Sequence, residues 1–139
     1  MWRRVADVIR QHEVHHLPAT ATVLEAARLM KGKACGAVVI MNKGHLEGIF
    51  TERDLVNRVV VAGRDPAKTK LGEVMTRGPD IIGPDAYTLE ALRMMEDGGY
   101  RHLPVVNRQV VIGVVSRRDF FGEEKAQLDR ERVLWEQVG

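Results

Sequence analysis

Two stretches of the chain place a hydroxyl residue three positions before an aspartate: Thr51 and Asp54 in GIFTERD, and Ser116 and Asp119 in GVVSRRD. In each stretch a glycine and two apolar residues come first, so the pattern predicts a buried strand that runs into a helix. A hydroxyl at the helix N-cap with an acid three residues later is typical of a capping box, which satisfies free backbone amides. Either stretch alone would be interpreted as a helix cap.

A corner of this kind can also bind a nucleotide. The free amides at the start of a helix attract anions such as phosphate. A carboxylate on the first turn can accept two hydrogen bonds from the vicinal hydroxyls of a ribose, each contributing about 1.5–3 kcal/mol. Because arginines neighbour Asp54 and Asp119 in the sequence, we expect these carboxylates to accept hydrogen bonds rather than to shuttle protons. We therefore expect a binding protein that is not an enzyme, with no catalytic residue and no catalytic cofactor.

The two corners belong to an internal repeat. Residues 21–56 align with residues 86–121 without a gap, and ten of the 36 positions are identical. Average composition would give about one identity in sixteen. Residues 5–9 and 71–75 also match, so we interpret the chain as a duplication. The predicted division is repeat 1 at 1–62, a linker at 63–70, repeat 2 at 71–122 and a C-terminal helical extension at 123–139.

Each repeat has the same predicted order of elements, β-α-β-β-α, which gives an α/β fold of the α+β type with two pseudo-twofold halves. The first strands are expected at 14–17 and 80–82. The helices that follow have apolar residues at i, i+3, i+4 and i+7, and Gly32 and Gly98-Gly99 are expected to end them. Two paired strands come next in each repeat: 37–41 with 45–50, and 102–106 with 110–115. The last helices are expected from Thr51 over 52–61, and from Ser116 over 117 onward.

The last part of the chain, EEKAQLDRERVLWEQV, has no counterpart in the first repeat. Its composition strongly favours a helix. Leu128, Leu134 and Trp135 are its candidate packing residues. We expect this helix to serve docking or dimerisation.

Composition restricts the class of protein. The chain has 139 residues, 45% of them hydrophobic and 29% charged, and its net charge is only +2. That balance suits a soluble domain and makes nucleic acid an unlikely partner by composition. The single cysteine, Cys35, cannot form an intramolecular disulfide, and no apolar run approaches membrane-spanning length. With no signal-peptide pattern at its start, the expected location is cytoplasmic, with no membrane partner.

His12, His15 and His16 raise the question of a metal site. Their spacing is H-E-V-H-H, which differs from the H-E-x-x-H arrangement that places two histidines on one helical face. On a strand, His15 and His16 would point to opposite faces. No cysteine or acid cluster completes a tetrahedral set, so we predict no metal site.

Taken together, the repeated G-h-h-[ST]-x-x-D corner, LGEVMTRGPDIIGPDAYTLEALRMM at 71–95 and YRHLPVV at 100–106 resemble the CBS domain pair, also called the Bateman module. The resemblance spans residues 5–121 and is that of a stand-alone two-CBS signalling protein. The second repeat is the more typical. In the first, Ile9-Arg10 replaces Met75-Thr76, and Val39 replaces Pro104.

The resemblance implies two nucleotide clefts between the repeats. One would use Thr51, Asp54 and Ile49, closed by Thr76 and Ile81. The other would use Ser116, Asp119 and Val114, closed by Val14, His15, Cys35, Gly36 and Ala37. Arg101, His102, Arg117 and Arg118 fall where phosphates would bind. Because these four cluster in the second repeat, we expect unequal sites, with the phosphate-rich ligand at Asp119.

The resemblance implies a sensor of AMP, ADP, ATP, NAD(H) or S-adenosylmethionine that forms a homodimer and signals to an unknown effector protein by conformational change. The dimer would use helices 52–61 and 117 onward with Leu134 and Trp135. Two alternatives stay open. One is a nucleic-acid-binding module with a basic surface around Arg53, Arg64, Lys68 and Lys70, and the other is an enzyme acting on a nucleotide. Neither has a motif to support it.

Overall fold

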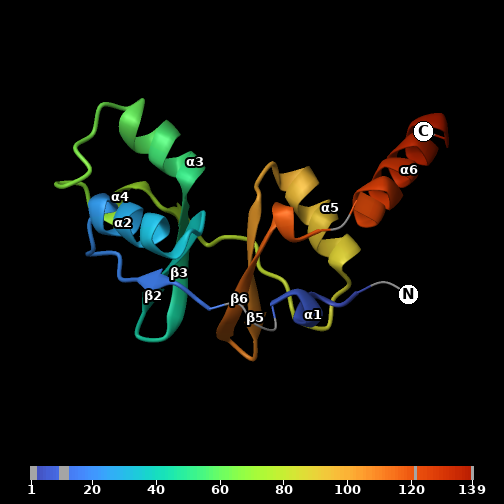
Figure 1. Ribbon diagram of the computed structural model, residues 1–139, viewed down its shortest axis with the longest axis horizontal. Coiled ribbons are helices and arrows are strands. Elements are labelled where there is room, and N and C mark those ends of the chain that lie inside the picture. The colour runs from blue at the N-terminus through green and yellow to red at the C-terminus, as the bar shows by residue number, and fades with distance from the viewer. Residues whose placement is uncertain (1–2, 10–12, 121, 139) are drawn as a thin grey trace. The chain divides into compact units, whose positions relative to one another are not determined.

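The computed structural model describes residues 3–9, 13–120 and 122–138, and these form two compact units (Figure 1). The first, here the Asp54 unit, is Glu13–Asp80 with Arg108–Val111. The second, here the Asp119 unit, takes the described residues of Met1–His12, Ile81–Asn107 and Ile112–Gly139. Each unit therefore contains a short N-terminal segment from the other sequence repeat. The repeat boundaries expected from the sequence are a separate division and stay a prediction.

The Asp54 unit contains a four-stranded sheet in the order β1-β2-β3-β4. Strand β1 (His16–Leu17) runs parallel to β2 (Ala37–Asn42), whereas β3 (His45–Thr51) is antiparallel to both β2 and β4 (Thr76–Arg77). The helices of this unit are α2 (Val23–Lys33), α3 (Glu52–Asp54), the π-helical η1 (Leu55–Val60) and α4 (Leu71–Val74).

One hydrophobic core holds the Asp54 unit together. Val23, Ala26 and Met30 lie on one face of α2 and pack with Ile40 and Phe50 of the sheet. Their i, i+3, i+7 spacing is the period of one helical face, so the apolar pattern in the sequence accounts for the packing. This core fixes β3, and β3 ends at the Thr51–Asp54 corner.

The Asp119 unit is built around the hairpin of β5 (His102–Asn107) and β6 (Val110–Ser116). Its helices are α1 (Val5–Ile9), α5 (Thr88–Gly98), the 3-10 turn η2 (Arg117–Asp119) and α6 (Gly122–Val138). A bridge from Ile82 to Val105 adds a parallel partner beside β5. Its separate core contains Leu92, Leu103 and Leu128.

These elements confirm the predicted mixed α/β fold class with an additional C-terminal helix. Several boundaries differ from expectation. Helix α2 continues past Gly32 to Lys33 and ends at Ala34, which is left-handed with φ of 52°. Ala34 aligns with Gly99, the left-handed cap of α5, so the two helices end at matching positions although only one cap is glycine. The strand expected at 14–17 is reduced to β1, and the one at 80–82 to the bridge at Ile82.

The two final helices are also less regular than predicted. After Thr51 the chain makes one α-helical turn and then the π-helix η1, which is rich in β-branched valine, a residue that favours α-helix weakly. After Ser116 it makes only η2, because Phe120 has an extended backbone (φ −94°, ψ 140°) and is buried in the core. Helix α6 then begins at Gly122. Leu128 packs in the core, whereas Leu134 and Trp135 are exposed, and the docking or dimer role expected for them stays a prediction.

The repeated glycines, Gly48 and Gly113, lie against the two segments that are exchanged between the repeats, residues 71–76 and 5–9. A Cβ added at Gly48 would lie 2.7 Å from both the Met75 sulfur and the Thr76 carbonyl oxygen. A Cβ at Gly113 would lie 3.0 Å from the Ile9 Cβ. Ile9 and Met75 occupy matching positions in the two copies of the N-terminal segment. Each glycine therefore makes room for the segment contributed by the other repeat.

No helix in the described residues is both long enough and apolar enough to cross a membrane.

Candidate functional site

At the Asp54 corner the predicted capping box is present. The Thr51 Oγ1 accepts a hydrogen bond from the Asp54 amide at 3.2 Å, and the Asp54 Oδ2 accepts from the Thr51 amide at 3.0 Å. The Thr51 hydroxyl also donates to the same Oδ2 at 3.1 Å. Two of the three described contacts of this carboxylate therefore come from Thr51 alone.

The other oxygen of Asp54 faces Arg58, which sequence reasoning missed. The Arg58 Nε lies 3.5 Å from the Asp54 Oδ1. Its Nη1 donates to the carbonyls of Val74 and Met75, both at 3.2 Å. The i, i+4 spacing of Asp54 and Arg58 on a predicted helix was the available signal. Arg58 thus ties the candidate ribose-binding acid to the segment exchanged from the second repeat.

Several predicted site residues lie together around this corner. Ile49 on β3 pairs with Thr76 on β4, so the structure brings these two candidates side by side. Ala37 pairs with Thr51, and the Gly36 carbonyl accepts from the Glu52 amide at 3.1 Å. Gly36 and Ala37 therefore line the Thr51 corner of their own unit, whereas the resemblance assigned them to the Asp119 cleft. Their part in that cleft stays a prediction.

At the Asp119 corner the carboxylate has fewer partners. The Ser116 amide donates to the Asp119 Oδ2 at 2.7 Å. Within the described part of the chain, this is the only hydrogen bond or ion pair that the Asp119 carboxylate makes. No arginine stands where Arg58 stands, because the aligned position is Glu123.

The predicted basic residues lie on the strand ends and the turn of this unit. The Arg117 amide donates to the Arg101 carbonyl at 2.9 Å, which repeats the Glu52 to Gly36 bond of the other unit. Arg101 and Arg118 are exposed and His102 is half-buried at the start of β5. Val114 is half-buried on β6. The backbone thus places Arg101 and His102 near the Ser116 turn, and their role toward phosphates stays a prediction.

Arg117 is already engaged. Its guanidinium pairs with Glu96 on α5, and Glu96 also pairs with Arg132 on α6 at 2.9 Å. The hydrogen bond from Arg117, together with the charges of Arg117 and Arg132, lowers the pKa of Glu96 below its ordinary value. The Nη2 of Arg117 is therefore occupied by Glu96, and a phosphate would compete with Glu96 for this guanidinium.

Four further candidates lie in one unit, although the resemblance assigned them to the cleft of the acid in the other unit. Ile81, assigned to the Asp54 cleft, is an exposed residue of the Asp119 unit. Val14, His15 and Cys35, assigned to the Asp119 cleft, are half-buried residues of the Asp54 unit. The His15 carbonyl accepts from the Val39 amide at 3.0 Å, which fixes His15 at the edge of β2.

Among the described residues, no three histidine, cysteine, aspartate or glutamate side chains are placed to hold a metal ion. His12 lies outside the described residues.

Comparisons with known proteins agree on one family. The model of the CBS domain matches residues 5–61 and again residues 71–125. The CBS domain-containing protein CBSX3, mitochondrial, of Arabidopsis thaliana is 37% identical over 103 residues, which cover 70% of this chain and 50% of that protein. The chain spans no more than half the length of this relative and only 20% of the Arabidopsis protein CBSCBSPB3, which is 34% identical.

Solved structures show the same fold. A protein with CBS domains from Burkholderia ambifaria is 29% identical with a TM-score of 0.80, covering 84% of this chain and 90% of that one. A CBS domain protein from Pyrobaculum aerophilum, complexed with AMP, is 24% identical with a TM-score of 0.81, covering 92% of this chain and 99% of that one. With two matches to the family model and the same arrangement of helices and strands, the chain belongs to the CBS domain family and carries a pair of these regulatory domains.

Proposed function

We propose that the chain is a non-enzymatic regulatory module that binds adenosine-containing nucleotides, with its stronger site at the Asp119 corner. The observation that carries this proposal is the bonding of Asp119. Its Oδ2 accepts from the Ser116 amide at 2.7 Å, and its Oδ1 has no partner within the described residues. A carboxylate held by one backbone bond is oriented and still has acceptor positions for the two hydroxyls of a ribose.

The chemistry around Asp119 suits a nucleotide. Val114 offers an apolar contact for the base, and Arg101, His102, Arg117 and Arg118 supply the positive charge that a phosphate requires. Cys35, Gly36 and Ala37, with Val14 and His15, are proposed to complete the base pocket. The Pyrobaculum protein complexed with AMP supports an adenosine nucleotide as the ligand class.

The Asp54 corner is proposed as a second, weaker site that uses Thr51, Asp54, Ile49, Thr76 and Ile81. Its carboxylate already accepts from Thr51 and faces Arg58. A ribose would have to displace part of this arrangement, which reduces the net gain from each new hydrogen bond.

Signalling is proposed to follow from differential affinity, because a ligand shifts a conformational equilibrium only if it binds one arrangement more tightly than the other. The output would be a change in binding to an effector protein. Exposed apolar residues on two helices suit a homodimer: Val56, Val60 and Val61 after Asp54, and Leu134 and Trp135 on α6. We propose a cytoplasmic location.

The test uses the purified chain. Mass spectrometry of ligand released from the protein should identify an adenosine compound, and thermal melts with AMP, ADP, ATP, NAD and S-adenosylmethionine should rank the panel. A bound nucleotide at 100 times its Kd adds about 2.7 kcal/mol to stability and gives a clear rise in Tm. The rise should be strongly reduced in Asp119→Ala. No released nucleotide and no rise with any compound would overturn the proposal.

A further inference from the structure

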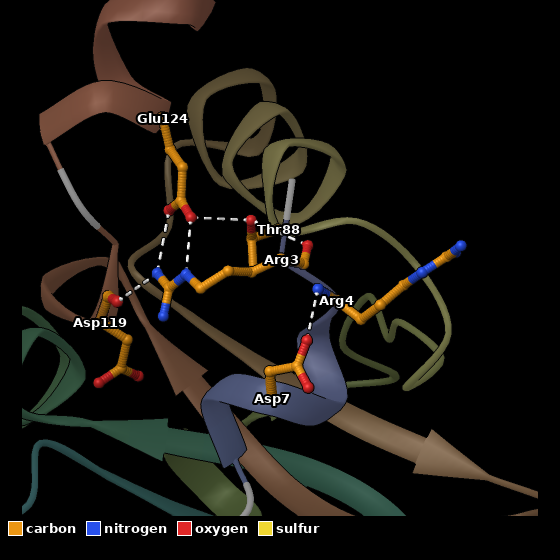
Figure 2. A network of polar contacts seen from close by, with 6 residues as sticks. All are labelled: Arg3, Arg4, Asp7, Thr88, Asp119 and Glu124. Atoms are coloured by element: carbon orange, nitrogen blue, oxygen red, sulfur yellow. Dashed lines mark hydrogen bonds and ion pairs between the residues drawn. The ribbon is translucent and has the colours of Figure 1, made fainter. Parts of the chain in front are cut away.

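A polar network within the Asp119 unit joins segments from both ends of the chain (Figure 2). Arg3 precedes α1, Thr88 is the first residue of α5, and Glu124 lies on the first turn of α6. The Arg3 Nε donates to the Glu124 Oε1 at 3.0 Å and its Nη2 donates to the Oε2 at 3.2 Å. The two parallel bonds make a bidentate arginine–carboxylate pair, which restrains both side chains.

Glu124 is buried, with only 3% of its surface exposed. A carboxylate removed from water to this extent requires charged and hydrogen-bonded partners. The Thr88 hydroxyl is one, at 3.0 Å from the Oε1, and it lies 3.2 Å from the Arg3 carbonyl as well. The Thr88 amide donates to that same carbonyl at 2.9 Å. Arg3 is therefore held through its backbone and through its side chain.

Arg3 also reaches the candidate ligand turn. Its Nη2 donates to the backbone carbonyl of Asp119 at 3.2 Å. Figure 2 shows the guanidinium lying between the Asp119 backbone and the Glu124 carboxylate. One side chain thus connects the residue proposed to bind ribose with the first turn of the C-terminal helix.

A second connection leaves the same turn from Arg117. This residue pairs with Glu96 of α5, and Glu96 pairs with Arg132 of α6. The turn over residues 116–119 is therefore joined to the first turn of α6 through Arg3 and to its later part through Glu96. The Thr51–Asp54 corner is followed by η1, which ends at Val60, whereas α6 continues to Val138.

We propose that Arg3 is a positioning residue that couples ligand occupancy at the Asp119 turn to the docking of α6. The inference rests on the proposed function and specifies its output. Since Arg3 holds the turn and α6 together, a docked α6 keeps the Asp119 backbone in place for ligand. By linkage, a ligand that binds this turn stabilises the docked helix by the same factor.

The ligand-free test compares two variants of the full chain by hydrogen exchange. Arg3→Gln removes the bonds to both Asp119 and Glu124, so amides of residues 117–120 and 124–128 should exchange faster together. Arg93→Gln is the matched control, because Arg93 binds Glu131 on α6 at 2.9 and 2.6 Å and no described contact joins it to the turn. It should loosen α6 only around Glu131, because the Arg3 bonds keep the first turn of the helix docked, and it should leave residues 117–120 unchanged. Equal behaviour of the turn in both variants would overturn the proposal.

The second test adds AMP as the probe. Arg3→Gln should weaken AMP binding about 10-fold, the size expected for losing one hydrogen bond that involves a charged group, while Arg93→Gln should change it less than about 2-fold. Arg3→Lys keeps the charge without the fork and should fall between wild type and Arg3→Gln. AMP should also slow exchange at residues 124–128 in wild type but not in Arg3→Gln.

The outcomes separate the two proposals. The coupling is contradicted if Arg3→Gln does not change AMP affinity. It is also contradicted if AMP does not change the hydrogen exchange of α6 in wild type. Either result leaves the proposed function intact. If wild type binds neither AMP nor the other nucleotides, the proposed function fails. The ligand-free comparison then still decides whether Arg3 joins the turn to α6. A circular dichroism melt of each variant excludes unfolding as the cause.

Discussion

The Asp54 and Asp119 units each contain a hairpin, a glycine on its second strand and a hydroxyl–acid corner after it. The side-chain carboxylates of Asp54 and Asp119 nevertheless have different hydrogen-bond and ion-pair partners. Asp54 is bound locally by Thr51 and faces Arg58, which in turn holds the exchanged segment at Val74 and Met75. Asp119 makes a single described side-chain bond, to the Ser116 amide, and its backbone is held by Arg3.

The difference shows how duplication can separate two roles. In the Asp54 unit the acid is part of the structure that keeps the corner closed, so its oxygens are largely occupied. In the Asp119 unit Arg3, Thr88 and Glu124 hold the neighbouring backbone, and we propose that the Asp119 carboxylate is the ligand-binding group. The capping box is present at both corners, and the difference between them lies in the additional partners of the Asp54 carboxylate.

The largest predicted effect concerns the exchanged segments. Gly48→Ala places a Cβ at 2.7 Å from the Thr76 carbonyl oxygen, and that oxygen belongs to the backbone of β4, which is paired with β3. Gly113→Ala meets the Ile9 side chain at 3.0 Å, where small shifts can relieve the contact. We expect a loss of about 3 kcal/mol for Gly48→Ala and about 1 kcal/mol for Gly113→Ala in urea unfolding. Equal losses would show that the two segments pack alike.

In the absence of ligand, substitution of Asp54 and of Asp119 should lower the free energy of unfolding by different, smaller amounts. Asp54→Asn weakens the bonds from Thr51 and the attraction to Arg58, so we expect it to cost about 1–2 kcal/mol of unfolding free energy. Asp119→Asn weakens one backbone bond and should cost about 0.5 kcal/mol. Thermal melts of both variants at neutral pH measure the order. A larger loss at Asp119 would reverse the assignment of structural and binding roles.

The smallest effect is a pH dependence that belongs to the Asp119 unit. The hydrogen bond from Arg117 lowers the pKa of Glu96, and the bond from Arg93 lowers the pKa of Glu131. A carboxylate with a lowered folded-state pKa stabilises the fold fully above its ordinary value of 4.5 and loses that contribution as pH falls below it. The arginines are partly exposed, so solvent screening limits the two pairs together to about 1 kcal/mol.

This dependence is measured by following α6 with hydrogen exchange or circular dichroism between pH 6 and pH 3. The double variant Glu96→Gln/Glu131→Gln should flatten the profile, because its amides do not titrate. As the control, Arg64→Gln removes the ion pair with Glu73 in the Asp54 unit and should leave the profile of α6 unchanged. A profile that keeps its slope in the double variant would place the effect elsewhere.

Local patterns in the sequence predicted much of this arrangement. The repeat at 65 residues located both corners, and apolar spacing located α2, α5 and the paired strands. The features that the sequence did not predict depend on contacts between residues far apart in the chain. The 5–9 and 71–75 segments are short and apolar, and nothing local shows which hairpin each one joins. The role of Arg3 is equally hidden, since its partners Asp119 and Glu124 lie more than 100 positions away. The end of α2 could have been predicted from the sequence. Glycine alone pointed to Gly32, whereas the left-handed residue is Ala34, which aligns with the left-handed Gly99.

The central claim, that the two corners are unequal sites, is tested most directly by calorimetric titration of AMP into wild type, Asp119→Ala and Asp54→Ala. Loss of one to two ribose hydrogen bonds should weaken binding at the affected site about 10- to 100-fold. We predict that Asp119→Ala removes the tighter phase and that Asp54→Ala leaves it within about 2-fold of wild type. Equal losses in the two variants, or loss of the tighter phase in Asp54→Ala alone, would contradict the account.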